Sequence, residues 1–238
     1  GLLKGISKYH DNLGGTMFPS TITPQRMASI EDNADRLGLP RIILMENAGN
    51  VVSKTMKGLL GGASGKSIVV VAGTGNNGGD GFVAARHLTG EGARVEIILL
   101  GTSEEIKTKE ASANWNVASN MTESIKITTI HKELPTDVRD RIQGADGIVD
   151  AIFGTGMRDV IREPHSTVID AMNSAAGKKL AVDIPSGLDP STGEVHDKAF
   201  RADLTVSFHQ YKVGLVGRKE YTGDVLVEGI GIPPEAEK

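Results

Sequence analysis

The chain of 238 residues contains no cysteine, which excludes disulfides, thiol nucleophiles and thiolate-bound zinc. Aromatic residues make up only 4% of it, with Trp115 as the single tryptophan, so no array of rings is available for stacking nucleotide bases. An excess of positive charge is also missing: the formal net charge is −4, whereas nucleic-acid binders usually carry a basic surface. We therefore expect no nucleic-acid partner.

Long apolar runs are absent too. No stretch reaches the roughly 18 apolar residues of a membrane span, and the N-terminus lacks the apolar core of a secretory signal. We expect no membrane association and a cytoplasmic location, with targeting to an organelle left open. Residues 1–16 contain Lys4, Lys8 and His10 among glycines, and we predict a flexible leader or an expression remnant there. Residues 17–238 are then expected to form a single domain.

Short β-branched runs alternate with helical patterns along this domain. We predict strands within residues 67–73, 93–101, 125–130, 146–154, 178–187, 202–208 and 223–233. We predict helices over 24–37, 41–60, 80–88, 109–119, 137–142 and 166–176. This alternation is typical of βαβ units, which indicates an α/β fold. The expected architecture is a Rossmann-like three-layer αβα sandwich with a mainly parallel central sheet, on which the two leading helices pack.

Three of the predicted strands end in segments that carry an acid, glycines and hydroxylated residues. These segments read "GTGNNGGDG" at 73–81, "DAIFGTGMRD" at 150–159 and "DIPSGLDPSTG" at 183–193. In open α/β sheets, ligands bind beyond the carboxyl ends of the strands. The three segments therefore predict one pocket at that edge of the sheet.

The first segment fits the pattern G-x-G-x-x-G through Gly73, Gly75 and Gly78. Alone this pattern is weak, because it fits a tight strand-to-helix turn as well as a helix N-terminus that binds pyrophosphate. The acid that a dinucleotide-binding fold places about 20 residues further on is missing here. Asp80 would repel a phosphate, so we expect it to cap the following helix or to bind a ribose hydroxyl.

Two further groups of residues suggest chemistry. Asn77, Asp150 and Ser186 all offer oxygen atoms, which together with backbone carbonyls would suit a hard cation. Asp183 precedes Pro185 and Gly187, whose turn would hold it rigidly at a strand end, as an acid/base group requires. Lys212 follows a strand at the same edge, and its simplest interpretation is a surface lysine.

In this order, the segments "LMENAG", "GTGNNGGDGFVAARHL", "VDAIFGTGMR", "AVDIPSGLDPSTG" and "ADLTVSFHQYKVGL" resemble the N-terminal domain family of NAD(P)H-hydrate epimerases, also called the YjeF N-terminal domain. The resemblance implies an isomerase that interconverts the C6 (R)- and (S)-hydrates of NADH and NADPH in nicotinamide nucleotide repair. It also implies one K⁺ per subunit, a homodimer, and an NAD(P)H-hydrate dehydratase as the functional partner.

The family pattern also implies site residues. Those that would bind the substrate are Asn76, Asn77, Gly78, Gly79, Asp80, Gly154, Thr155, Gly156, Met157, Arg158, Asp159, Val160 and Asp183. Those that would bind K⁺ are Asn77, Asp150 and Ser186. Asp159 stands where the family often has glycine, which adds a charge near the expected phosphates.

The chemistry of the implied substrate gives two residues catalytic roles. C6 of the hydrate is a hemiaminal carbon, so its inversion requires either ring opening or loss and return of water, and both routes need proton transfer. We predict Asp183 as the acid/base group, with Lys212 orienting or tuning it. A non-catalytic nucleotide-binding or scaffold protein of the same fold is the alternative. An NAD-dependent oxidoreductase is less favoured, because no tyrosine starts a Tyr-x-x-x-Lys sequence.

Overall fold

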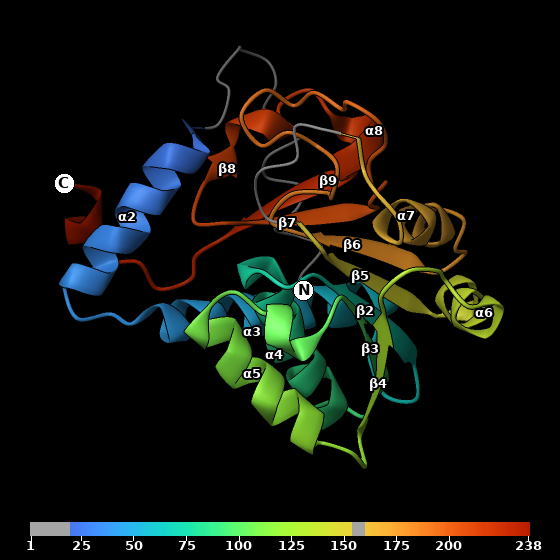
Figure 1. The fold of residues 1–238 in the computed structure, drawn as a ribbon. Coiled ribbons are helices and arrows are strands. Elements are labelled where there is room, and N and C mark those ends of the chain that lie inside the picture. Colours follow the sequence, from blue (N-terminus) through green and yellow to red (C-terminus); the bar gives the residue numbers. More distant parts are fainter. Residues whose placement is uncertain (1–19, 154–159) are drawn as a thin grey trace.

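The computed structural model describes residues 20–153 and 160–238, and the segments 1–16 and 154–159 singled out above lie outside them. Seven parallel strands form the central sheet (Figure 1). In chain order they are β2 (Ser67–Ala72), β3 (Arg94–Leu100), β4 (Ile125–Ile130), β5 (Gly147–Ala151), β6 (Lys178–Val182), β7 (Leu204–Phe208) and β9 (Asp224–Glu228). Their order across the sheet is β4-β3-β2-β5-β6-β7-β9.

Helices cover both faces of this sheet (Figure 1). One face carries α3 (Arg41–Leu60), α4 (Asn76–Gly90) and α5 (Lys109–Asn120), and the other carries α6 (Thr136–Gly144) and α7 (His165–Asn173). Val70 and Ile97 belong to the core on the first face, and the neighbouring Val71 and Ile98 belong to the core on the second. Alternate residues of the central strands are thus buried on opposite faces, which explains their uninterrupted apolar runs. The predicted αβα sandwich is confirmed.

The N-terminal helix α2 (Pro24–Arg36) begins as its sequence predicts, because Thr23 Oγ1 accepts a hydrogen bond from the Arg26 backbone N–H at 3.2 Å. Its predicted place on the sheet is wrong. It packs mainly against the C-terminal turn η3 (Pro234–Glu237), while α3 lies on the sheet beside α4. The sequence also gave no sign of the small parallel pair β1 (Thr21–Ile22) and β8 (Tyr211–Lys212). The remaining short elements are η1 (Ser103–Glu105), η2 (Val213–Leu215) and α8 (Lys219–Thr222).

The glycine-rich segment after β2 is helical from Asn76, four residues earlier than predicted. Its glycines allow close packing. A Cβ atom on Gly78 would lie 2.0 Å from the carbonyl oxygen of Gly73, and one on Gly79 would lie 2.6 Å from the side chain of Met45. The N-cap is Gly75 and Asp80 sits in the second turn, so the interpretation of Asp80 as the helix cap is wrong.

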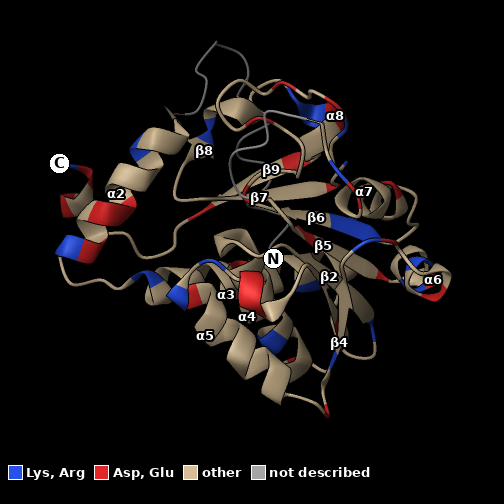
Figure 2. Ribbon diagram, in the orientation of Figure 1, with Lys and Arg blue, Asp and Glu red and all other residues tan. Residues whose placement is uncertain are grey.

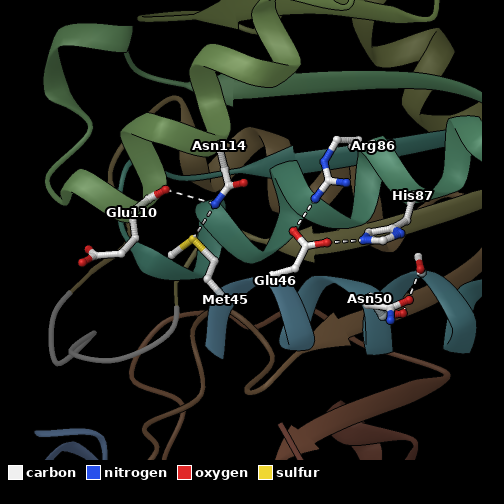
Figure 3. A network of polar contacts seen from close by, with 8 residues as sticks. Met45, Glu46, Asn50, Arg86, His87, Glu110 and Asn114 are labelled. Atoms are coloured by element: carbon white, nitrogen blue, oxygen red, sulfur yellow. Dashed lines mark hydrogen bonds and ion pairs between the residues drawn. The ribbon is translucent and has the colours of Figure 1, made fainter. Parts of the chain in front are cut away.

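Polar contacts join the three helices of this face (Figure 3). Glu46 on α3 binds Arg86 and His87 on α4, with 2.7 Å between its Oε1 and His87 Nε2. Asn114 on α5 donates from Nδ2 to the backbone oxygen of Glu110 at 3.1 Å and contacts Met45 Sδ at 3.3 Å. These contacts join α3 to the C-terminal half of α4 and to α5.

Charged residues lie mainly on the helices and loops, whereas the strands are largely uncharged (Figure 2). Within the described part of the chain, no helix combines the length and apolar character that crossing a membrane would require.

Candidate functional site

The order in which the chain adds strands to the sheet reverses between β2 and β5. The chain passes from β2 through β3 to β4 on one side, and then continues with β5 on the other side of β2. Such a switch point leaves a crevice beyond the carboxyl ends of the strands. A cavity of about 1240 Å³ lies there, walled by α2, α3, the start of α4 and the turns that follow β5, β6 and β7. It is larger than the roughly 300–1,000 Å³ of most ligand pockets, so a dinucleotide has room in it.

Asp183 occupies a strained turn directly after β6. Its φ is +66°, and the N–H of Ile184 donates to the carbonyl of Val182 at 2.8 Å, which closes a three-residue γ-turn around it. Positive φ is uncommon for any residue but glycine, and such strain is concentrated at functional sites. With 20% of its side chain exposed, Asp183 faces the cavity.

A second γ-turn of the same kind follows β7. His209 has a φ of +69°, and the N–H of Gln210 donates to the carbonyl of Phe208 at 2.8 Å. The two turns are joined, because the Phe208 N–H donates to Asp183 Oδ1 at 3.1 Å. The turn after β7 therefore holds the carboxyl of the turn after β6.

Lys212, on β8, completes this arrangement. Its side chain is only 5% exposed, so the interpretation as a surface lysine is wrong. The ammonium lies 3.0 Å from Asp183 Oδ1 and also donates to the carbonyl oxygens of Phe208 and Gln210, at 2.5 Å and 3.2 Å. All three of its protons have acceptors, so Lys212 positions the Asp183 carboxylate and neutralises it at close range.

Two more carboxyls from other elements face the same space. Asp80 comes from α4 and Glu31 from α2, and Arg41 Nη1, at the start of α3, lies 3.2 Å from Glu31 Oε2. Burial raises the pKa of Asp80 well above its usual value, and the charges of Asp183 and Glu31 raise it further. Burial likewise raises the pKa of Glu31, with Arg41 acting in the opposite direction.

Sequence reasoning missed Glu31. The one signal was its position four residues after Met27, which puts both residues on the same face of α2. Both line the cavity.

Two of the expected cation ligands, Asp150 and Ser186, are buried beneath residues that line the cavity and do not line it themselves. Asp150 on β5 is fully buried, and its carboxylate accepts from the Ser186 hydroxyl at 2.6 Å, the Ser186 N–H at 2.7 Å and the Ile152 N–H at 3.2 Å. Burial raises the pKa of Asp150 to about 6, against the lowering effect of these bonds. Asp150 and Ser186 are therefore brought together as predicted.

Asn77, the third expected cation ligand, lines the cavity from the first turn of α4 and is only 5% exposed. Its Nδ2 is buried and has no hydrogen-bond partner among the described residues. Of the other predicted substrate contacts, Asn76 lines the cavity and accepts a hydrogen bond from the Thr108 hydroxyl at 2.6 Å. Gly78 and Gly79 face protein atoms, and Val160 is 69% exposed.

Residues 41–214 match the family model described as "YjeF-related protein N-terminus". The bifunctional NAD(P)H-hydrate repair enzyme of Pyrobaculum aerophilum is 48% identical over 223 residues, which cover 91% of this chain and 43% of that protein. This chain therefore spans less than half the length of that relative.

Two shorter relatives match along almost their whole length. The NAD(P)H-hydrate epimerases of Cenarchaeum symbiosum and Nitrosopumilus maritimus are 44% and 43% identical, and the matched regions cover 91% of this chain and 98% of each relative. Among solved structures, a yeast protein superposes with a TM-score of 0.77 over 91% of both chains at 24% identity, which supports the fold.

Proposed function

This chain belongs to the family of YjeF-related protein N-termini, and we propose that it is an NAD(P)H-hydrate epimerase. It is then an isomerase that interconverts the (R)- and (S)-hydrates at C6 of NADH and NADPH. The relatives that carry this name match over 98% of their own length, which supports the assignment of that activity to this chain. The observation in the site that carries the proposal is the Asp183–Lys212 pair, held rigidly at the edge of a cavity large enough for a dinucleotide.

The reaction requires a proton donor and acceptor beside the C6 hydroxyl, and Asp183 has the right placement for this work. Its backbone is fixed by the γ-turn, and Oδ1 is occupied by Lys212 and by the Phe208 N–H. Its remaining oxygen, Oδ2, is the atom that would exchange a proton with the substrate. By binding Oδ1, Lys212 fixes the orientation of the carboxylate and therefore the position of Oδ2. Lys212 does not itself need to contact the substrate.

The start of α4 is the proposed site of the pyrophosphate. Gly79 is the first residue of this helix whose N–H bonds back along it, to the carbonyl of Gly75 at 3.2 Å. The preceding N–H groups have no acceptor within the helix and suit an anion. We assign the segment from Asn76 to Asp80 to substrate binding, together with Asp183 and residues 154–160.

The expected cation ligands fit a potassium ion. Asp150 is a fully buried carboxylate, and none of the described lysine, arginine or histidine side chains forms an ion pair with it. Rotating the Asn77 amide by half a turn would place Oδ1 where the unpartnered Nδ2 now lies. Asn77, Asp150 and Ser186 would then offer amide, carboxylate and hydroxyl oxygens, as hard cations require. When bound, K⁺ would organise the strand-end turns and attract phosphate oxygens.

The functional partner proposed for this chain is an NAD(P)H-hydrate dehydratase, because relatives of this family are bifunctional repair enzymes. Rapid exchange between the epimers would make the whole hydrate pool available to a dehydratase that accepts one of them. We also propose that the chain acts as a homodimer.

The proposed activity is tested by mixing one purified NADPH hydrate epimer with the protein and following the appearance of the other by chromatography. The wild-type protein should equilibrate the pair. Asp183→Asn should slow this about 10²- to 10⁴-fold, because it removes a positioned acid/base group. Asp170→Asn is the matched control, since Asp170 lies on α7 and its exposed carboxyl pairs with Lys198. A wild-type protein that leaves the epimer ratio unchanged would refute the assignment.

A further inference from the structure

The three interacting carboxyls of the cavity differ in their partners. Asp183 lies 3.0 Å from the Lys212 ammonium, and Glu31 lies 3.2 Å from the Arg41 guanidinium. Asp80 has no cation within 4 Å and no hydrogen bond to its carboxyl from residues 20–153 or 160–238. The site therefore holds two compensated carboxylates and one uncompensated carboxyl.

The surroundings of Asp80 favour its neutral form. Protein atoms surround its carboxyl, although part of the side chain remains accessible through the cavity. The charged groups that face it are Asp183, after β6, and Glu31, on α2, and both are negative. Burial and these two charges together raise its pKa. Asp183 is paired with a cation, whereas Asp80 is not, so the two carboxyls of one cavity lie in different electrostatic environments, as an acid and a base in one site usually do.

A separate observation marks this part of the cavity as a place for a ligand. The Asn77 amide, on the same helix, lines the cavity with a buried nitrogen that has no partner in the described chain. Buried polar groups are normally satisfied, so a bound group is expected there, and the potassium ion proposed above would fill that role one helical turn from Asp80.

On the basis of the proposed function, we propose that Asp80 is the second acid–base group of this site and donates a proton to the C6 hydroxyl, while Asp183 accepts the proton of the water that returns. Asp80 reaches the cavity from helix α4, and Asp183 reaches it from the strand-end turn. An epimerisation needs groups that can act on either face of C6, and two carboxyls carried by separate elements around one cavity meet the first requirement for this.

The step balances without an oxidant or a reductant. The Asp80 proton passes to the hydroxyl oxygen, the C6–O bond breaks with its electrons leaving on water, and the lone pair of the ring nitrogen forms a nitrogen–C6 double bond. Water then adds to the other face, the double-bond electrons return to nitrogen, and the second proton of the water passes to Asp183. The net change is an inverted C6 and one proton moved from Asp80 to Asp183. In the reverse direction Asp183 donates and Asp80 accepts.

The effect of Glu31 on the pKa of Asp80 can be measured. Its negative charge is one of the two that hold the proton on Asp80, so replacing it should lower the pKa of Asp80. Asp32 is the natural control. It is the next residue of the same helix, also pairs with Arg41, and has 54% of its side chain exposed to solvent.

The first experiment compares pH–rate profiles of epimerisation. A proton donor must be protonated to act, so the wild-type rate should fall as pH rises through the raised pKa of Asp80. Asp80→Asn should lower the rate about 10²- to 10⁴-fold and abolish this alkaline limb. Glu31→Gln should move the limb to lower pH, and Asp32→Asn should leave it in place. An Asp80→Asn protein with wild-type rate and profile would overturn the proposal, as would a limb that Glu31→Gln does not move.

The second experiment uses only the wild-type protein and so does not depend on the folding of any variant. The hydrate is incubated in H₂¹⁸O with the protein, and the oxygen at C6 is analysed by mass spectrometry against a sample without protein. Breaking the C6–O bond should introduce one ¹⁸O atom with each inversion. Inversion with retention of the original oxygen would overturn the proposal while leaving the proposed epimerase function intact. Absence of any wild-type inversion would instead refute that function.

Discussion

Two walls of the cavity each present one carboxyl, Asp80 on one and Asp183 on the other, and the two carboxyls are held in place by different means. The helix wall is the first turns of α4, residues 76–80, in ordinary helical geometry. The turn wall consists of the two γ-turns at Asp183 and His209 together with Lys212. Glycines fix the helix wall by letting α4 pack tightly on its neighbours, whereas left-handed backbone and a buried ammonium fix the turn wall.

The difference between the walls corresponds to the two proposed roles, with Asp80 as the proton donor and Asp183 as the proton acceptor. The turn wall contains a cation, the ammonium of Lys212, which pairs with the carboxylate of Asp183. The helix wall has no cation paired with Asp80 among the described residues, and burial favours the neutral form of this carboxyl. The following predictions alter one wall, or the ion site beneath both, and run from the largest expected effect to the smallest.

Lys212→Met should damage the turn wall most, because it leaves the carboxylate of Asp183 partly buried without its cation. Breaking a buried ion pair from one side typically costs about 3–5 kcal/mol of unfolding free energy, and epimerisation should fall with the loss of positioning. Urea unfolding followed by circular dichroism measures the first effect. Lys198→Met, which breaks the more exposed pair with Asp170, should cost under about 1 kcal/mol. Equal costs for the two variants would contradict the role of Lys212.

Gly78→Ala should damage the helix wall. The added Cβ would lie 2.0 Å from a backbone oxygen of Gly73, so the first turn of α4 must move, at a cost of about 1–3 kcal/mol. Gly90→Ala, at the other end of the same helix, has open space around its new Cβ and should be neutral or stabilising by up to about 1 kcal/mol. Thermal unfolding of the two variants in parallel decides whether these glycines serve packing.

Potassium should stabilise the protein from beneath both walls. At ten times its dissociation constant, a ligand that binds only the folded state adds about 1.4 kcal/mol, which is a shift of a few degrees in Tm for a chain of this size. KCl should therefore raise Tm above its value in the larger cation Cs⁺ at equal ionic strength. Asp150→Asn should remove the difference between the salts. A difference that survives in this variant would place the ion elsewhere.

Asp80→Asn should have a smaller effect on stability, one that depends on pH. The raised pKa of Asp80 means that the folded state favours its protonated form, so this contribution is complete below the unfolded pKa, near 4, and is lost as pH rises through the folded value. The asparagine variant does not titrate there. Its Tm relative to wild type should therefore increase from pH 4 towards pH 8 in thermal scans. A constant difference across that range would contradict the burial of the Asp80 charge.

The walls also differ in how far the sequence could predict them. The β-branched runs predicted the strands of the sheet well, because two-sided burial leaves a strong apolar signal. The glycines around Asn77 predicted a strand-to-helix junction, but their packing against Met45 depends on a helix far away in the sequence. Positive φ at Asp183 and His209 could not be predicted, because neither residue is a glycine and long-range bonds impose the turns.

The same reason explains the individual residues that were misjudged. The ammonium of Lys212 is bound by the carbonyl groups of Phe208 and Gln210, just before it in the chain, and Glu31 reaches the site from the N-terminal helix through tertiary packing alone. The closeness of Asp150 and Ser186 was predicted because Asp150 is near the end of one strand and Ser186 follows the neighbouring strand of the same parallel sheet.

The most direct test of the account is a crystal structure of the Asp183→Asn protein with one NADPH hydrate epimer bound. We predict that the hydrated ring lies between the two walls, with the C6 hydroxyl within hydrogen-bond distance, about 3 Å, of Asp80 or of residue 183. The pyrophosphate should lie at the start of α4. A ring bound elsewhere in the cavity, with C6 beyond the reach of both residues, would contradict the account.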